Sequence, residues 1–319
     1  MRIVFAGTPA VAVPSLRALA DSTHELVGVV TRPDRRAGRG RHLQASAVSL
    51  VAEELDLPVA KPAQPGDQEF LDQLRAWRPD AAAVVAYGAL LPQSALDIPP
   101  LGWINLHFSL LPAWRGAAPV QHSIWHGDEF TGATTFRIVP ELDAGPVFGT
   151  MTYAIPPHAT AGDVLGVLAR DGAKLLVDTM DAIAAGVARA EPQSGEGTSY
   201  AGKITVAEAA VTWAAPHWAV DRQIRACTPD PGAWTTLRGS RIKLGPVRPL
   251  NEGDAAGVGP GPRPGLAAGE LLPGKKCVLV GTAGRPVVLG QVAPAGKAYM
   301  DGAAWARGAR IESGERFGS

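Results

Sequence analysis

The residue types best suited to chemistry stand together in residues 104–116, INLHFSLLPAWRG. The first half of this stretch alternates apolar and polar residues, so Asn105, His107 and Ser109 should share one face of a strand. A lone buried Asn or His is usually no more than a hydrogen-bonded core residue. Here an amide and an imidazole precede a loop bounded by Pro and Gly, and this combination favours a reactive site.

A carboxylate, Asp143, follows in a separate loop at residues 140–146, PELDAGP. Asn105 offers an amide donor for a developing oxyanion. A carboxylate near His107 could orient the imidazole, tune its pKa or remove a proton from an attacking amine. We expect the two side chains within about 3 to 6 Å of each other. No serine or cysteine there stands out as a nucleophile with an adjacent base, which favours direct acyl or one-carbon transfer over a covalent intermediate.

Strands and helices alternate along the first 188 residues. The continuous apolar run 80–87 is typical of a strand buried on both faces of a parallel sheet. Alternating strands and helices predict an α/β fold with a doubly wound, mostly parallel, Rossmann-like sheet, whose ligands bind at the carboxyl ends of the strands. The predicted strands are 2–6, 25–31, 57–60, 80–87, 131–139 and 147–155, and the predicted helices are 10–20, 45–55, 68–77, 118–127 and 160–188.

The pattern changes after residue 188. Residues 189–204 are rich in Gly, Ser, Glu and Pro and read as a linker. Residues 205–319 alternate short strands with turns, which predicts an OB-like β-barrel domain. The predicted domains are therefore 1–188 and 205–319. The second is expected to contain strands 210–214, 233–237, 241–244, 277–281 and 286–292, helices 217–227 and 301–308, and a Gly- and Pro-rich excursion at 251–269.

Charge is balanced over the 319 residues but unevenly distributed. Residues 1–202 hold 15 Lys and Arg against 21 Asp and Glu, whereas residues 203–319 hold 15 against 9. A basic second half suits a polyanionic partner, although an ordinary solvated surface explains it equally well. The same two interpretations apply to an arginine-rich loop in the first half, which contains Arg32, Arg35, Arg36, Arg39 and Arg41.

Several classes of protein are disfavoured. Cys227 and Cys277 form neither a disulfide framework nor a thiolate metal site, which indicates a reducing compartment. No apolar run approaches the ~20 residues of a spanning helix, and residues 7–9 interrupt the amino-terminal run too early for a secretory signal. We expect a cytoplasmic protein without membrane partner or metal. The turn at 7–9, GTP, lacks the glycine spacing of a dinucleotide site, which argues against a nicotinamide oxidoreductase.

The motifs NLH at 105–107, SLLP at 109–112, RG at 115–116 and LDAG at 142–145 resemble those of the formyltransferases that use 10-formyltetrahydrofolate. The resemblance covers essentially the whole chain and is greatest to the members that act on methionyl-tRNA. Further matches are VFAGTP at 4–9, PDR at 33–35, AGRG at 37–40, VAYG at 85–88, LP at 91–92, WRGAAP at 114–119, PGAW at 231–234 and PAGK at 294–297.

This resemblance implies transfer of a formyl group from 10-formyltetrahydrofolate to the α-amino group of methionine on initiator methionyl-tRNA, by a monomer. It implies that Asn105, His107 and Asp143 are catalytic. It places the folate-binding loop at Ser109, Leu110, Leu111 and Pro112, with a pterin pocket near 87–91 and the strand before Asp143. It places the tRNA contacts of the first domain at Arg36, Arg39 and Arg41, and further contacts in the second domain.

Two other functions remain open at this point. A formyltransferase acting on glycinamide ribonucleotide or on a nucleotide sugar would share the same three catalytic residues. The arginine-rich loop and the basic second half do not suit so small a substrate. The second alternative is a nucleic-acid-binding protein that keeps the fold without turnover, which the intact Asn, His and Asp set disfavours.

Overall fold

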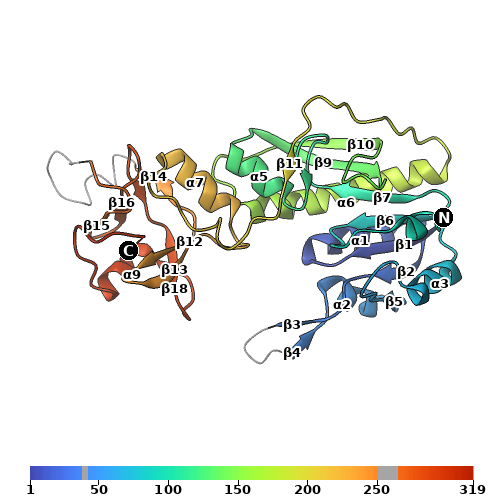
Figure 1. The fold of residues 1–319 in the computed structure, drawn as a ribbon, viewed down its shortest axis with the longest axis horizontal. Coiled ribbons are helices and arrows are strands. Elements are labelled where there is room, and N and C mark those ends of the chain that lie inside the picture. The colour runs from blue at the N-terminus through green and yellow to red at the C-terminus, as the bar shows by residue number, and fades with distance from the viewer. Residues whose placement is uncertain (38–41, 251–264, 319) are drawn as a thin grey trace. The chain divides into compact units, whose positions relative to one another are not determined.

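The computed structural model describes residues 1–37, 42–250 and 265–318 (Figure 1). Arg39, Arg41 and most of the predicted excursion at 251–269 lie outside the described residues. The chain divides into two compact units. Unit 1 contains Met1–Pro119, Phe130–Ala154 and Leu165–Ala201, and unit 2 contains Val120–Glu129, Ile155–Val164 and Gly202–Ser319.

Unit 1 is built on a seven-stranded sheet with the order β10-β9-β7-β6-β1-β2-β5. The pairs from β5 to β7 are parallel, and β9 and β10 add two antiparallel pairs at one edge. The predicted doubly wound, mostly parallel sheet is confirmed. The strands are β1 (Arg2–Gly7), β2 (Glu25–Val30), β5 (Val59–Ala60), β6 (Ala81–Val85), β7 (Trp103–His107), β9 (Phe130–Arg137) and β10 (Val147–Ala154).

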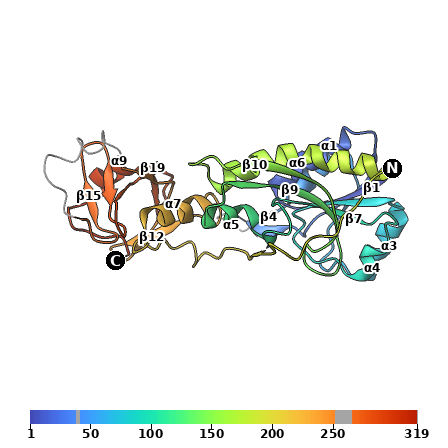
Figure 2. The same ribbon diagram turned by 90° about the horizontal axis from the view of Figure 1, so that it is seen from above.

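Helices cover both faces of this sheet. All five residues of β6 are buried, as expected for a central parallel strand between two helical layers. One face packs against Phe70, Leu71 and Leu74 of α3, and α1 and α6 run over the other (Figure 2). The helical elements of unit 1 are η1 (Ala10–Ala12), α1 (Val13–Ala20), α2 (Ala47–Glu54), α3 (Gln68–Trp77), α4 (Gln93–Leu96) and most of α6 (Ala161–Ala184), whereas α5 (Pro119–His126) belongs almost entirely to unit 2.

Helix α6 packs closely behind β7, the strand that carries the candidate site. Gly172 of α6 lies against Leu106, whose side chain would be 3.2 Å from an added Cβ. Thr179 of α6 and Thr135 of β9 share a buried hydroxyl–hydroxyl hydrogen bond of 2.8 Å. These contacts hold α6 against the face of the sheet that lies opposite to the face with Asn105 and His107.

Unit 2 carries antiparallel strands in two four-stranded sheets, β12-β13-β18-β19 and β14-β17-β16-β15. The predicted second domain of antiparallel strands is confirmed. Its strands are β12 (Trp234–Leu237), β13 (Ser240–Leu244), β14 (Arg248–Pro249), β15 (Leu271–Pro273), β16 (Val278–Val280), β17 (Val287–Val288), β18 (Gln291–Pro294) and β19 (Met300–Asp301), and α7 (His217–Ala226) and α9 (Gly302–Gly308) accompany them.

Two strand predictions for this unit are wrong. Residues 210–214 contain only an isolated bridge from Ala210 to Trp234: the N–H of Val211 donates to the carbonyl of Trp234, and the N–H of Thr212 donates to the Gln223 side chain. Residues 286–292 form parts of two strands in different sheets, β17 and β18. Apolar residues occur on both sides of that break, so the pattern alone does not reveal it.

Two further segments are more ordered than their composition suggests. The arginine-rich loop contains an antiparallel pair, β3 (Arg35–Ala37) with β4 (His42–Gln44). The predicted linker returns to the sheet: Glu191 bridges to Val147, and β11 (Tyr200–Ala201) pairs in parallel with β8 (Arg115–Gly116). Gly116 allows this approach, because a Cβ there would be 2.6 Å from the Ala201 carbonyl oxygen.

Candidate active site

Strand β7 brings Asn105 to the site. Asn105 lies between Val84 of β6 and Phe136 of β9 and is half-buried. Within the described part of the chain, no hydrogen bond engages its side-chain amide. The amide is therefore available to donate to a ligand oxygen at the carboxyl end of the strand.

His107 ends the same strand and is almost fully buried, with 6% of its surface exposed. Its Nε2 lies 2.8 Å from the carbonyl oxygen of Trp114. A carbonyl oxygen can only accept, so Nε2 carries the hydrogen and Nδ1 presents its lone pair. Trp114 has φ 59°, a left-handed conformation that costs roughly 1–2 kcal/mol for a residue with a side chain. The fixed tautomer of His107 therefore depends on a strained turn.

Asp143 faces the free side of this imidazole. Its Oδ2 is 3.7 Å from Nδ1 of His107, a separation within the range expected from the sequence. The same oxygen accepts a 2.8 Å hydrogen bond from the backbone N–H of Gly116. Asp143 is also left-handed, with φ 47°, and a Cβ at Gly145 would clash with the carbonyl of Arg137. The turn that presents this carboxylate therefore requires a glycine nearby.

Burial is the largest influence on the pKa of His107 and lowers it below its ordinary value of 6.5. The negative charge of Asp143 and the bond to Trp114 act in the opposite direction and are smaller. His107 is thus neutral at pH 7, and two acceptors, Nδ1 and the carboxylate, face each other. Such a pair is arranged to take up one proton, which both atoms would then share.

The predicted folate-binding loop is held in shape by its own hydrogen bonds. Ser109 is completely buried, and its hydroxyl donates to the carbonyl of Ala113 at 2.6 Å. Thr134 of β9 donates to the Ser109 carbonyl at 2.7 Å and accepts from the Leu111 N–H at 3.2 Å. Leu110, Leu111 and Pro112 are half-buried. These three residues present the surface that a ligand could contact, whereas the Ser109 side chain shapes the loop from inside.

Of the predicted tRNA-contacting arginines, the structure describes Arg36. It lies on β3 opposite Leu43 and is exposed, as is Leu43 with 70% of its surface accessible. Lys61 pairs with Asp34, the one acidic residue of this segment, at 2.7 Å. Asp34 is therefore already paired with Lys61, and it precedes the exposed arginines of β3 in the sequence.

Three side chains at the site were not anticipated from sequence as members of it. Arg115 is 7% exposed, Gln193 bonds to it and to the backbone around Asp143, and Ser199 accepts from the N–H of Trp114. Arg115 stands inside a recognisable motif. Gln193 and Ser199 stand in a stretch whose composition indicates a linker, and no local pattern distinguishes them.

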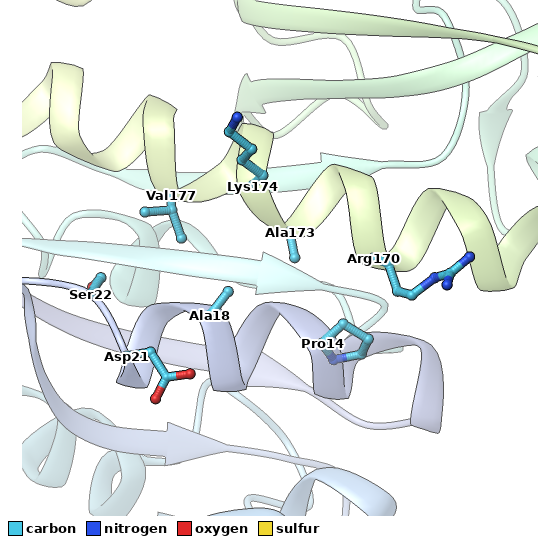
Figure 3. Close-up of a pocket in the computed structure, with 8 residues that line it drawn as sticks. All are labelled: Pro14, Ala18, Asp21, Ser22, Arg170, Ala173, Lys174 and Val177. Carbon is cyan, nitrogen blue, oxygen red and sulfur yellow. The ribbon is translucent and has the colours of Figure 1, made fainter.

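A pocket of about 420 Å³ lies elsewhere in unit 1, between α1 and α6 (Figure 3). The pocket is lined by Pro14, Ala18, Asp21, Ser22, Arg170, Ala173, Lys174 and Val177. Neither Asn105, His107 nor Asp143 lines it.

Among the residues the structure describes, no group of three His, Cys, Asp or Glu side chains could hold a metal ion. In the same residues, no helix is long and apolar enough to cross a membrane.

Comparison with known families agrees with this fold. The formyl transferase family matches residues 1–180, and the formyl transferase C-terminal domain matches residues 203–310. The chain belongs to the formyl transferase family. The methionyl-tRNA formyltransferase of Nocardioides sp. is 61% identical over 318 residues, which cover 100% of this chain and 98% of that protein. That of Thermobifida fusca is also 61% identical over 318 residues, covering 100% and 99%.

Solved structures show the same fold at low sequence identity. WlaRD, a sugar 3N-formyl transferase crystallised in the presence of dTDP and 5-N-formyl-THF, superposes with a TM-score of 0.65 at 16% identity, over 93% of this chain and 99% of its own. A methionyl-tRNA formyltransferase from Clostridium thermocellum superposes with a TM-score of 0.56 at 13% identity, over 79% and 95%. The predicted family is confirmed.

Proposed function

We propose that this protein is a methionyl-tRNA formyltransferase, which moves a formyl group from 10-formyltetrahydrofolate to the α-amino group of methionine on initiator methionyl-tRNA. The observation that carries the proposal is the amide of Asn105, which has no partner among the described residues and shares a strand face with His107, whose Nδ1 lies 3.7 Å from Oδ2 of Asp143. Full-length relatives at 61% identity carry that name and support the choice of substrate.

The amine must attack as the free base. An α-amino group has an ordinary pKa of about 8, so a useful fraction is neutral at pH 7. Asn105 donates to the formyl oxygen as negative charge develops there. The amine attacks the formyl carbon, the bond from that carbon to N10 of the folate breaks, and tetrahydrofolate leaves. Nδ1 of His107 together with the Asp143 carboxylate takes up the proton that the amine loses and can return it to N10 of the leaving folate. Because Nε2–H is committed to Trp114, His107 acts here as acceptor and not as donor to the formyl oxygen.

The folate donor supplies the activated formyl carbon. The half-buried Leu110, Leu111 and Pro112 would hold it through apolar contact and backbone groups, with Ser109 and Thr134 keeping the loop in shape. Partly exposed apolar side chains beside a free amide fit a ligand with a flat apolar ring and one polar end.

The tRNA would be held by basic residues in both halves of the chain. Arg36, Arg39 and Arg41 would contact the acceptor stem, and the second domain, with an excess of six basic residues over residues 203–319, would follow the phosphates. We propose that the protein is cytoplasmic and that it is a monomer. Size-exclusion chromatography with light scattering, at the concentrations used for activity, would test the oligomeric state.

One experiment separates the open functions. The purified protein is incubated with 10-formyltetrahydrofolate and, in turn, initiator methionyl-tRNA, uncharged initiator tRNA or glycinamide ribonucleotide. We expect formylmethionine only with the charged tRNA. Formylation of the ribonucleotide, or of a nucleotide amino sugar added as a fourth acceptor, would instead favour a small-molecule enzyme. Binding of tRNA without any product would favour a binding protein without turnover.

A further inference from the structure

The residues 191–201, which we call the strap, return to the loops that orient His107 and Asp143. At one end, Glu191 and Val147 exchange backbone hydrogen bonds of 2.7 and 2.8 Å. At the other end, β11 pairs with β8, and the carbonyl of Ala201 accepts from the N–H of Ala117 at 2.8 Å. The strap is therefore anchored on both sides of the candidate site.

Gln193 makes the central contacts of the strap. Its Nε2 donates to the carbonyl oxygens of Asp143 and Gly145, both at 2.8 Å. Its Oε1 accepts from Nη2 and Nε of Arg115, at 2.8 and 3.2 Å. The partners fix the orientation of the amide, because carbonyls only accept and a guanidinium only donates. All the hydrogen-bonding capacity of the side chain is used.

These contacts join the two backbone segments that place the Asp143 carboxylate. One segment is the left-handed turn at Asp143 itself. The other contains Arg115, whose neighbour Gly116 donates its N–H to Asp143 Oδ2 at 2.8 Å. The side-chain amide of Gln193 thus holds both the backbone of Asp143 and the loop whose Gly116 N–H binds the Asp143 carboxylate.

A second strap residue acts on the imidazole side. The hydroxyl of Ser199 accepts from the Trp114 N–H at 2.9 Å, and the Trp114 carbonyl accepts from His107 Nε2. Both halves of the His107–Asp143 pair are therefore supported from the same eleven-residue segment.

We propose that Gln193 is a positioning residue for formyl transfer, which keeps the Asp143 carboxylate at proton-sharing distance from His107. The inference rests on the proposed function for its kinetic consequence, although the geometry can be tested without it. The competing explanation is that the strap only stabilises the fold.

The decisive variant is Gln193→Glu, which keeps the shape of the side chain. One carboxylate oxygen can still accept from Arg115, but the other would face two carbonyl oxygens and repel them. The turn at Asp143 is then released while the strap stays attached to Arg115. Ser194→Ala is the matched control, because the one partner of the Ser194 hydroxyl among the described residues is the N–H of Glu196, also in the strap. If the Glu variant does not fold, Gln193→Met removes the hydrogen bonds at similar length.

We expect Gln193→Glu to lower kcat by about 10- to 100-fold, because a displacement of about 1 Å has this effect on an oriented site. KM for folate and KM for charged tRNA should stay near those of Ser194→Ala, and the protein should remain folded at the assay temperature. Crystal structures of both variants would give the distance between Nδ1 of His107 and Oδ2 of Asp143, which should increase only in Gln193→Glu.

An unchanged distance or an unchanged kcat in the folded variant would overturn the proposal. So would a loss of activity that is matched by the loss of folded protein. If the wild-type protein formylated no acceptor, the proposed function would fail, whereas the distance in the two crystal structures would still decide whether Gln193 positions Asp143.

Discussion

At the scale of single residues, the reactive group that we propose is a pair. His107 has one nitrogen committed to Trp114, and its other nitrogen faces the carboxylate of Asp143 at 3.7 Å. This distance exceeds a normal hydrogen bond, as expected for two acceptors that await a proton. The neutral imidazole, not an imidazolium, is therefore the resting form of the site.

Replacing Asp143→Asn should nearly abolish turnover. One oxygen, Oδ2, contacts both the Gly116 N–H and His107 Nδ1, so the oxygen of the new amide can keep the bond to Gly116, but the uncharged amide can no longer help to take up the proton. We expect kcat to fall about 10²- to 10⁴-fold, the usual contribution of a positioned acid or base. The measurement is formylation of initiator methionyl-tRNA under saturating substrates. Near-normal turnover with normal tRNA binding would show that Asp143 has no such role.

The buried histidines should also make stability depend on pH. The pKa of His107 and that of His24 are both lowered from 6.5, mainly by burial. As pH falls below about 6.5, the unfolded chain binds protons first, so the free energy of unfolding decreases until each folded pKa is reached. The slope is limited to about 1.4 kcal/mol per pH unit for each histidine, the value for one proton.

Urea titrations at several pH values between about 7.5 and 5.5 would measure this slope. The variant His107→Gln should show a shallower dependence than the wild type, since one of the two buried imidazoles is gone. A flat dependence in the wild type, or an equal slope in the variant, would argue against a depressed pKa at His107.

At the scale of elements, the site depends on a close contact between β8 and the strap. Gly116 has φ 120°, and an added Cβ would be 2.6 Å from the Ala201 carbonyl. Gly116→Ala should therefore push the two segments apart, reduce kcat by at least about 10-fold and destabilise the fold by about 1–3 kcal/mol. Gly166→Ala on α6 is the control, because nothing lies within 4 Å of its added Cβ.

Thermal unfolding and kcat of both variants would be compared. The control should be neutral or slightly stabilised, since Ala favours a helix over Gly by about 1 kcal/mol. Equal behaviour of the two alanine variants would mean that the close approach of Gly116 to the strap is not required.

The sequence predicts the elements whose own pattern determines them and misses those determined by distant partners. Residues 3–7 and 81–85 are without polar side chains and become buried stretches of strand. The two-residue strands β8 and β11 have no pattern of their own, because their pairing joins segments about 85 residues apart. Asn105, His107 and Asp143 are found because chemistry limits their types. Gln193 is not, because its hydrogen bonds exist only in the folded chain.

At the scale of the whole molecule, charge is divided between the two halves. Residues 1–202 have six more acidic than basic residues, and residues 203–319 have six more basic than acidic. A polyanion is therefore expected to interact mainly with the second half, helped by the arginines near β3 and β4. The affinity for tRNA should fall steeply with salt as bound counterions are released.

The variant Arg36→Ala tests the contribution of the first half. Arg36 is exposed on β3, so its loss should weaken tRNA binding and reduce the slope of log affinity against log salt by about 1. Arg75→Ala is the control, since Arg75 is paired with Asp72 at 2.8 Å. Filter binding over a range of salt would measure both. Equal slopes for wild type and Arg36→Ala would remove Arg36 from the tRNA interface.

The return of the strap along the site changes where the catalytic part of the polypeptide ends. Gln193 and Ser199 lie beyond residue 188, where composition alone would place the domain boundary. A protease cut at residue 188 would free the carbonyl of Asp143 and the amide of Trp114 from their partners, besides removing the basic half. Turnover would then be lost for two reasons, the missing strap and the missing basic half. Cleavage after Ala201 would keep the strap and remove only the basic half, so it would separate tRNA binding from the formyl-transfer step.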